Sequence, residues 1–335
     1  MQSASHRDLA EEMGLTIVPV DDLTIERVIN DSDGTFEFVA AKGTLSKKRR
    51  KQIEKLVIPP AWSHVRIADF ANSHIQAVGR DQKGRLQYLY HERWEEVREA
   101  VKARRLRVFG QALPRIRKTV ERDLKRPLTS RRGVIATVVR LIDRQLIRIG
   151  NEQYVRDGTY WASTLENSHV KIRQGRVRLS YTAKSGKQVD LELKDPALVR
   201  RIKKLRNMRG KRLFQIRKKS KRGRSSINLR ASHINAYLTK AAGTAVSAKD
   251  FRSFAASALA VAQLSESEDA SVAQAAKTVS KRLRNTPAVA RNSYIHPSII
   301  SAAQKSQLDE GLTKGRKRKG LDVCENALMR FLEKA

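Results

Sequence analysis

Residues 170–193, VKIRQGRVRLSYTAKSGKQVDLEL, decide the fold class that we expect for this chain. Every second position is apolar: Val170 and Ile172, then Val177, Leu179 and Tyr181, then Val189, Leu191 and Leu193. Such alternation is typical of strands with one buried face, and the breaks at Gln174-Gly175 and Ser185-Gly186 are typical of turns. The stretch therefore predicts three antiparallel strands, with Lys184 at the second turn.

The segments on either side of this stretch have helical periodicity instead. Apolar residues recur at three- to five-residue spacing from Glu92 to Leu124, and a second apolar stripe runs from Arg132 to Ile149 and stops at a glycine. Arg148 is therefore expected in the last turn of the second helix. After residue 193 we expect mainly helices, apart from a basic loop at Lys218–Ser226 and a mobile segment at Ser265–Ala275.

The first part of the chain has a different pattern, with short runs that favour strands. These runs are Leu15–Val20, Phe36–Ala40, His64–Ala68, Ile75–Gly79 and Leu86–Tyr90. One helix is expected at Lys47–Ile58, stopped by Pro59-Pro60. We therefore expect an α+β protein with a small β-rich N-terminal domain, residues 1–95, and a larger, mainly α-helical domain, residues 96–335, which carries the three-stranded antiparallel sheet and ends in a basic tail.

The charge of the chain indicates a polyanionic partner. Lys and Arg total 69 against 34 Asp and Glu, which gives a net charge of +35. No acidic residue lies between Asp195 and Asp250, whereas Arg200–Arg224 contains fourteen Lys or Arg residues. Phosphates attract such a concentration of cations, so nucleic acid is the favoured partner. Charge alone does not separate an enzyme from a DNA-packaging or RNA-binding protein.

Several classes of chemistry lack support in the sequence. Cys324 is the only cysteine, which excludes a disulfide within the chain and favours a reducing compartment. No P-loop motif occurs, and no histidine pair has the spacing of a helical zinc site, so neither a nucleotide cofactor nor a metal is expected. Acidic metal ligands brought together from distant segments are the alternative. No apolar run is long enough for a membrane span or resembles a signal peptide. We expect a soluble, cytoplasmic protein that associates with nucleic acid.

Four motifs remain, and together they point to one family. They are Gly79-Arg-Asp-Gln-Lys-Gly-Arg-Leu-Gln-Tyr-Leu-Tyr-His91, Leu141-Ile-Asp-Arg-Gln-Leu-Ile-Arg-Ile-Gly-Asn151, Lys249-Asp-Phe-Arg252 and Asn285-Thr-Pro-Ala-Val-Ala-Arg-Asn-Ser-Tyr-Ile-His-Pro297. In this order and spacing they resemble the bacterial and poxvirus-type topoisomerase IB family, over residues 58–297. The resemblance implies a C-shaped clamp around duplex DNA, a monomer, and relaxation of supercoils without ATP or metal.

The resemblance also implies catalytic roles for six residues. Tyr294 matches the nucleophile that becomes joined to the 3′ phosphate, and Arg148 and Arg252 match the arginines that hold the phosphate, a task suited to guanidinium groups. Without the motif, we would expect Tyr294 to be an ordinary packing residue and the two arginines to lie on the surface. Lys184 matches the general acid for the 5′ oxygen, with Lys187, three residues away, as its rival. Lys249 matches a second lysine near the site. Asn285 stands where poxvirus enzymes have a histidine, so a neutral amide is expected to contact the phosphate.

A second group of residues is implied to contact the DNA. Arg80 lies in the first motif, and Gln87, Tyr88 and Tyr90 match its Gln-Tyr-x-Tyr element. Alternate side chains of a strand share a face, so the two tyrosines are expected to point together, although sheet packing is the alternative for one of them. Tyr154 resembles a position near the DNA backbone, and a core tyrosine is the alternative.

Two rival functions remain at this point. A tyrosine recombinase has the same catalytic arginines, lysine and tyrosine, but its usual His-x-x-Arg is here Lys249-Asp-Phe-Arg252. A basic DNA-packaging protein has the charge without the chemistry. The Gln-Tyr-x-Tyr element and the Lys-x-x-Arg spacing favour the topoisomerase.

Overall fold

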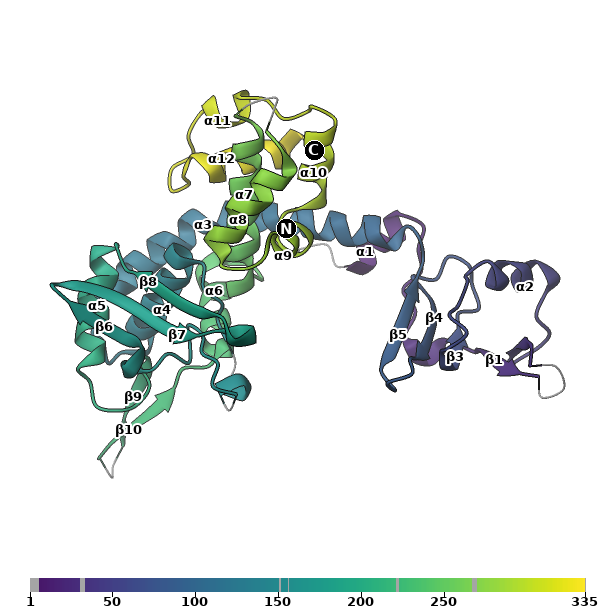
Figure 1. Ribbon diagram of the computed structural model, residues 1–335, viewed down its shortest axis with the longest axis horizontal. Coiled ribbons are helices and arrows are strands. Elements are labelled where there is room, and N and C mark those ends of the chain that lie inside the picture. Colours follow the sequence, from purple (N-terminus) through teal and green to yellow (C-terminus); the bar gives the residue numbers. More distant parts are fainter. Residues whose placement is uncertain are drawn as a thin grey trace. The chain divides into compact units, whose positions relative to one another are not determined.

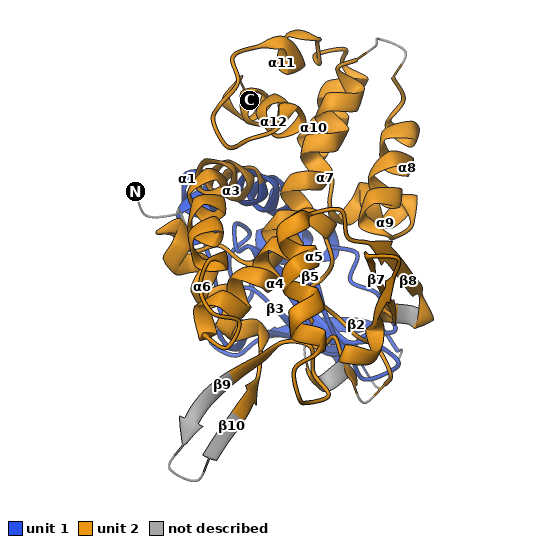
Figure 2. Ribbon diagram, turned by 90° about the vertical axis from the view of Figure 1, so that its left-hand side faces the viewer, with its two compact units in different colours: residues 1–102 blue, residues 103–335 orange. Residues whose placement is uncertain are grey.

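A computed structural model describes residues 6–30, 34–150, 152–155, 157–220, 223–266 and 270–334, with the backbone alone for 153, 154, 185, 217–220 and 223–225. The chain divides into two compact units, residues 1–102 and 103–335, which are coloured separately in Figure 2. The expected boundary near residue 95 falls inside a continuous helix, α3 (Trp94–Leu124), and stays a prediction. None of the described helices is both long enough and apolar enough to span a membrane.

The first unit is built on a five-stranded antiparallel sheet, in the order β2-β1-β3-β4-β5 (Figure 1). Its elements are α1 (His6–Glu12), the 3₁₀ turn η1 (Val20–Asp22), β1 (Ile25–Ile29), β2 (Phe36–Ala40), α2 (Lys47–Glu54), β3 (Ser63–Ile67), β4 (Ile75–Arg80), β5 (Leu86–Tyr90) and the start of α3. Ile25, Ile53, Val65, Ile67 and Ala77 form its largest core cluster. The expectation of a small β-rich domain is confirmed.

Three details of this unit differ from the sequence-based expectation. Residues 15–20 form no strand, because Thr16 makes only an isolated bridge to Ser73 and the chain then enters η1. The missing strand is β1, which alternation did not reveal because Glu26 and Arg27 interrupt its apolar residues. Helix α2 ends at Glu54 rather than Ile58, since the cap at Lys55 is followed by Val57 with a positive φ.

The second unit is mainly helical and carries the expected three-stranded sheet, in the order β6-β7-β8 (Figure 1). Its helices and strands are α4 (Arg131–Gln145), β6 (Val170–Arg173), β7 (Arg176–Thr182), β8 (Gln188–Glu192), α5 (Pro196–Arg206), β9 (Gln215–Ser220), β10 (Gly223–Asn228), α6 (Ala231–Ala242), α7 (Ala248–Leu264), α8 (Val272–Leu283), α9 (Pro287–Ser293), α10 (Pro297–Gln304), α11 (Gly311–Lys314) and α12 (Val323–Lys334). Short 3₁₀ turns are η2 (Glu152–Val155), η3 (Asn167–His169) and η4 (Lys184–Gly186). The prediction of three antiparallel strands at 170–193 is confirmed.

Two expected irregular segments are wrong in part. The described part of the basic stretch Lys218–Ser226 is not a loop, because β9 and β10 pair antiparallel from Gln215 with Asn228 to Ser220 with Gly223. Residues 221 and 222 lie outside the described residues. In the Ser265–Ala275 segment, residues 267–269 lie outside the described residues. Its end already belongs to α8, where Ser271 caps the helix by accepting from the backbone N–H of Gln274.

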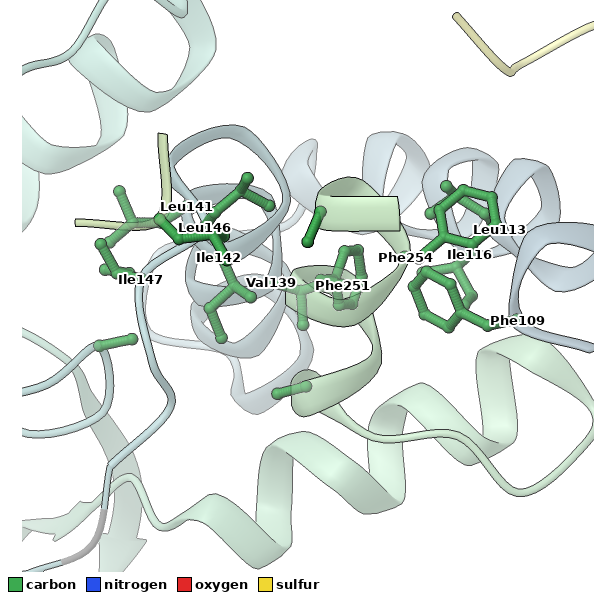
Figure 3. Packing of buried hydrophobic residues seen from close by; sticks show 14 of the residues in the cluster. Phe109, Leu113, Ile116, Val139, Leu141, Ile142, Leu146, Ile147, Phe251 and Phe254 are labelled. Carbon is green, nitrogen blue, oxygen red and sulfur yellow. The ribbon is translucent and has the colours of Figure 1, made fainter. Parts of the chain in front are cut away.

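Helix α7 lies in the core of the second unit and is held there by aromatic side chains. Figure 3 shows Phe251 and Phe254 of α7 near Phe109 of α3, with ring-centroid distances of 4.9 and 5.4 Å. Gly110 permits this packing, because a Cβ at that position would lie 2.6 Å from the Phe254 ring. The position of α7 matters for function because its first turns carry Lys249 and Arg252.

Candidate active site

A cavity of about 620 Å³ brings together four segments of the second unit that are far apart in sequence. Five of the six expected catalytic residues line it: Arg148, Lys184, Lys249, Arg252 and Tyr294. Lys249 and Arg252 both come from the first turns of α7, and the other three come from separate segments. The cavity thus combines one phenolic hydroxyl with four potentially cationic side chains, which is the composition needed to hold a phosphodiester and attack it.

Tyr294 is fixed by the backbone at the end of α9. Its N–H donates to Ala290 O at 3.2 Å, and its carbonyl accepts from the Ser257 hydroxyl of α7 at 3.3 Å. Ser257 also accepts from the N–H of His296 at 3.2 Å, so one buried side chain holds both sides of Ile295. These contacts attach the tyrosine-bearing loop to the same helix that carries Arg252.

The electrostatic environment of Tyr294 favours its ionised form. Arg252 Nε donates to the Tyr294 hydroxyl at 3.4 Å, and its guanidinium lies 4.8 Å from the ring centroid. Burial by itself raises the pKa of the hydroxyl. The charges of Arg252 and Arg148 and hydrogen bonds from both outweigh burial, so the pKa lies below its usual range. A lower pKa increases the fraction of phenolate, the stronger nucleophile.

Arg252 is a buried residue and not a surface arginine. Its side chain is 3% exposed, and it donates to the carbonyl oxygens of Leu146 and of Leu283, the latter at 3.2 Å. Burial lowers its pKa. With its Nη atoms bound to backbone oxygens and Nε directed at Tyr294, the guanidinium has a defined orientation in the cavity.

Arg148 lies beyond α4, so its expected place in the last turn of that helix is wrong. The helix ends at Gln145 because Leu146 adopts the left-handed conformation with φ 51° and buries its side chain in the core. The chain then extends, and the Arg148 carbonyl accepts from Ala162 N–H at 3.0 Å. This turn directs the half-buried Arg148 side chain into the cavity rather than along the helix.

Trp161 supports Arg148 and was not anticipated from the sequence. Its ring lies 5.8 Å from the Arg148 guanidinium, a cation–π distance, and it lines the same cavity. Gly150 makes room for it, because Gly150 has φ +86° and a Cβ there would lie 2.1 Å from Trp161 Cβ. The only signal in the sequence was an aromatic residue shortly after the Arg148 motif, which is too weak to assign.

Lys184 and Lys249 line the cavity from two different elements, η4 and α7. Lys184 is exposed at η4, the turn between β7 and β8, as the alternation predicted. Lys187 is also exposed and lines a smaller neighbouring cavity together with Lys184. Lys249 is exposed in the first turn of α7, where the adjacent Asp250 is paired with Arg105 of α3. The charge of Asp250 is therefore engaged away from the lysine.

Asn285 differs from the other five expected residues because it does not line this cavity and both polar atoms of its side chain are buried. Its amide nitrogen and oxygen are both buried and make no hydrogen bond to any described residue. Buried polar atoms are normally satisfied, so an unsatisfied amide next to Arg284, which lines a neighbouring small cavity, is a candidate ligand-binding group. Its contact with phosphate stays a prediction.

The expected DNA-contacting residues of the first unit lie on or next to β5. Tyr88 and Tyr90 point to the same side, with stacked rings 5.9 Å apart, and each is 41% exposed. The Tyr90 ring also stacks on Trp94 at 6.1 Å, so packing stays the alternative for Tyr90. Gln87 donates to Asp81 at 2.9 Å, and the exposed Arg80 donates to Gly84 O at 2.8 Å. The side chain of Tyr154 lies outside the described residues.

Comparison with known proteins identifies the family of this chain. Residues 91–318 match the model of the eukaryotic DNA topoisomerase I catalytic core, and residues 35–81 match that of the bacterial DNA topoisomerase IB N-terminal domain. The chain is also similar to DNA topoisomerase 1B of Acanthamoeba polyphaga mimivirus, with 33% identity over 264 residues, 75% of this chain and 79% of that relative. The chain belongs to the type IB DNA topoisomerase family. This assignment favours the topoisomerase over the recombinase and the packaging protein.

Proposed function

We propose that this protein relaxes supercoiled duplex DNA by transient cleavage of one strand through a 3′-phosphotyrosyl intermediate, without ATP or metal. The observation that carries the proposal is the Tyr294 hydroxyl, 3.4 Å from Arg252 Nε in a cavity that Arg148, Lys184 and Lys249 also line. Guanidinium and ammonium groups supply there the positive charge that a metal supplies in other phosphoryl-transfer sites.

The proposed reaction balances in atoms and charge. The Tyr294 hydroxyl gives its proton to water and its oxygen forms a bond to phosphorus, while the bond from phosphorus to the 5′ oxygen breaks. Arg148 and Arg252 stabilise the charge on the non-bridging oxygens, and Asn285 adds a neutral donor. Lys184 gives a proton to the departing 5′ oxygen, with Lys249 assisting proton transfer. The free strand rotates, and the reverse steps reseal it.

The same scheme explains why no nucleotide is required. The phosphotyrosyl ester conserves the energy of the phosphodiester, and torsion in the DNA drives the rotation. In this proposal the DNA-contacting surface includes Tyr88, Tyr90, Gln87 and Arg80. In the same proposal the protein acts as a monomer, and its two units close around the duplex as a C-shaped clamp.

Relaxation of plasmid DNA tests the proposal directly. The purified protein should relax positively and negatively supercoiled plasmid in excess chelator without ATP. Detergent added during the reaction should trap protein covalently joined to a 3′ DNA end, and Tyr294→Phe should abolish both signals. Activity that disappears on chelation and returns with added metal contradicts the mechanism, as does a covalent adduct in Tyr294→Phe.

A further inference from the structure

Three arginine side chains converge on the C-terminal end of α4. Arg282 donates to Arg144 O at 2.6 Å, Arg284 donates to Gln145 O at 2.7 Å, and Arg252 donates to Leu146 O. The last carbonyls of a helix have no partner within the helix and carry its negative dipole end, so cationic donors are favourable there. The three contacts attach the end of α4 to α7 and to the end of α8.

Arg284 differs from the other two arginines in its backbone. It caps α8 in the left-handed conformation, with φ 56° and ψ 50°, a position that glycine normally occupies. A side chain with a Cβ is strained there, and glycine would form the same turn without strain. Strained backbone of this kind clusters at functional sites, so we infer that the Arg284 side chain has a function that glycine would not supply.

The side chain of Arg284 reaches the neighbourhood of the candidate active site. It is half-buried and lines a small cavity of about 40 Å³ with Arg148, Lys184 and Arg252. Tyr181 also lines this cavity, and burial raises its pKa to about 12 although the charges of Arg284, Arg252 and Arg148 oppose the rise. Tyr181 is therefore neutral at physiological pH, and Arg284 has no anionic partner in it.

The contact between Arg284 and Gln145 O joins two segments that are 139 residues apart in the sequence. On one side, residue 284 directly precedes Asn285 and the cap of α9, and Tyr294 ends that helix. On the other side, Gln145 is the last residue of α4 and lies three positions before Arg148. This hydrogen bond thus holds the start of the segment that leads to Tyr294 next to the segment that leads to Arg148.

We propose that Arg284 is a positioning residue for DNA cleavage, which aligns Tyr294 and Asn285 with Arg148 through its bond to Gln145 O. The inference rests on the proposed function, because it assumes that Tyr294 is the nucleophile. Arg284 does not contact the reacting atoms in this scheme. Its removal should therefore slow the chemical step without weakening DNA binding.

Arg284→Gly is the informative variant because it removes the side chain and relieves the backbone strain at the same time. The single-turnover cleavage rate at saturating enzyme should fall roughly 10- to 100-fold, the scale expected for a misplaced reacting group. The DNA dissociation constant should stay at the wild-type value. The melting temperature should change little, because relief of the strained backbone at residue 284 offsets the lost bond to Gln145 O. Arg284→Asn, which tolerates the left-handed conformation, provides a second variant should the glycine variant fold poorly.

Gln174→Gly is the matched control, because Gln174 also has a positive φ of 45° but an exposed side chain in the β6–β7 turn. It should cleave at the wild-type rate. Wild-type cleavage by both Arg284 variants overturns the inference. A loss of rate also overturns it if, in both variants, it accompanies equally weakened DNA binding or a lower melting temperature. Tyr294→Phe separates the two proposals: if it still cleaves, the proposed function fails, and if only Arg284 proves dispensable, the positioning role alone fails.

Discussion

Replacement of Lys184 by alanine separates the proposed general acid from its neighbour Lys187. An alkoxide leaving group needs a proton, whereas a thiolate leaves without one. DNA in which sulfur replaces the bridging 5′ oxygen should therefore restore cleavage to a variant that lacks the acid. Lys184 lines the same cavity as Tyr294 and Arg252, which makes it the favoured donor.

The structure sets the expected size of the effect. Lys184 is exposed at a turn, and replacement of such a side chain changes stability by no more than about 0.5 kcal/mol. Loss of a general acid slows a reaction roughly 10²- to 10⁴-fold, equivalent to about 2.7–5.4 kcal/mol in the activation barrier. The rate effect should exceed the stability effect several-fold, so the two measurements are separable.

Single-turnover cleavage of matched oxygen and sulfur substrates is the assay, with urea denaturation alongside. Lys184→Ala should be slow on the oxygen substrate and near the wild-type rate on the sulfur substrate. Lys187→Ala, the matched control in the same hairpin, should be mildly affected on either. Sulfur rescue of Lys187→Ala together with an inactive Lys184→Ala would refute the assignment and place the acid three residues further along the turn.

Three further predictions follow from the site and the charge. Arg252→Ala should cleave both the oxygen and the sulfur substrate slowly. It should also lower the free energy of unfolding by about 2–6 kcal/mol, because two buried carbonyl oxygens lose their donor. An unchanged midpoint of urea denaturation contradicts the stability effect. The lowered pKa of Tyr294 increases the fraction of phenolate at a given pH, so the cleavage rate should rise with pH to a midpoint below the usual value of about 10. Arg148→Ala should move that midpoint upward. A pH–rate profile whose midpoint does not move in this variant argues against the electrostatic account. DNA affinity should fall steeply as salt rises, because Pro196–Lys249 contains no acidic residue and supplies many cations for phosphate contacts. The binding constant should change by about 0.9 log units per phosphate contact for each log unit of salt concentration. A flat salt dependence shows that this charge faces away from the DNA.

The local patterns of the sequence were sufficient for much of the fold. Alternation at 170–193 predicted β6, β7 and β8, and helical periodicity predicted α3, because both patterns depend on neighbours within a few residues. The same alternation placed Lys184 at a turn. The motif order predicted five residues that the structure gathers around one cavity, although their roles stay proposals.

Tertiary contacts decided what the local patterns left open. The strands β9 and β10 form by pairing with each other across a basic, weakly apolar sequence in which alternation gives little signal. Helix α4 stops at Gln145 because Leu146 and Ile147 gain burial in the core and distant arginines satisfy the last carbonyls, neither of which a periodic stripe reveals. Trp161 lies beside Arg148 because Gly150 leaves space for it. Sequence periodicity determines which face of an element is buried, but only the packed chain determines which distant residues meet there.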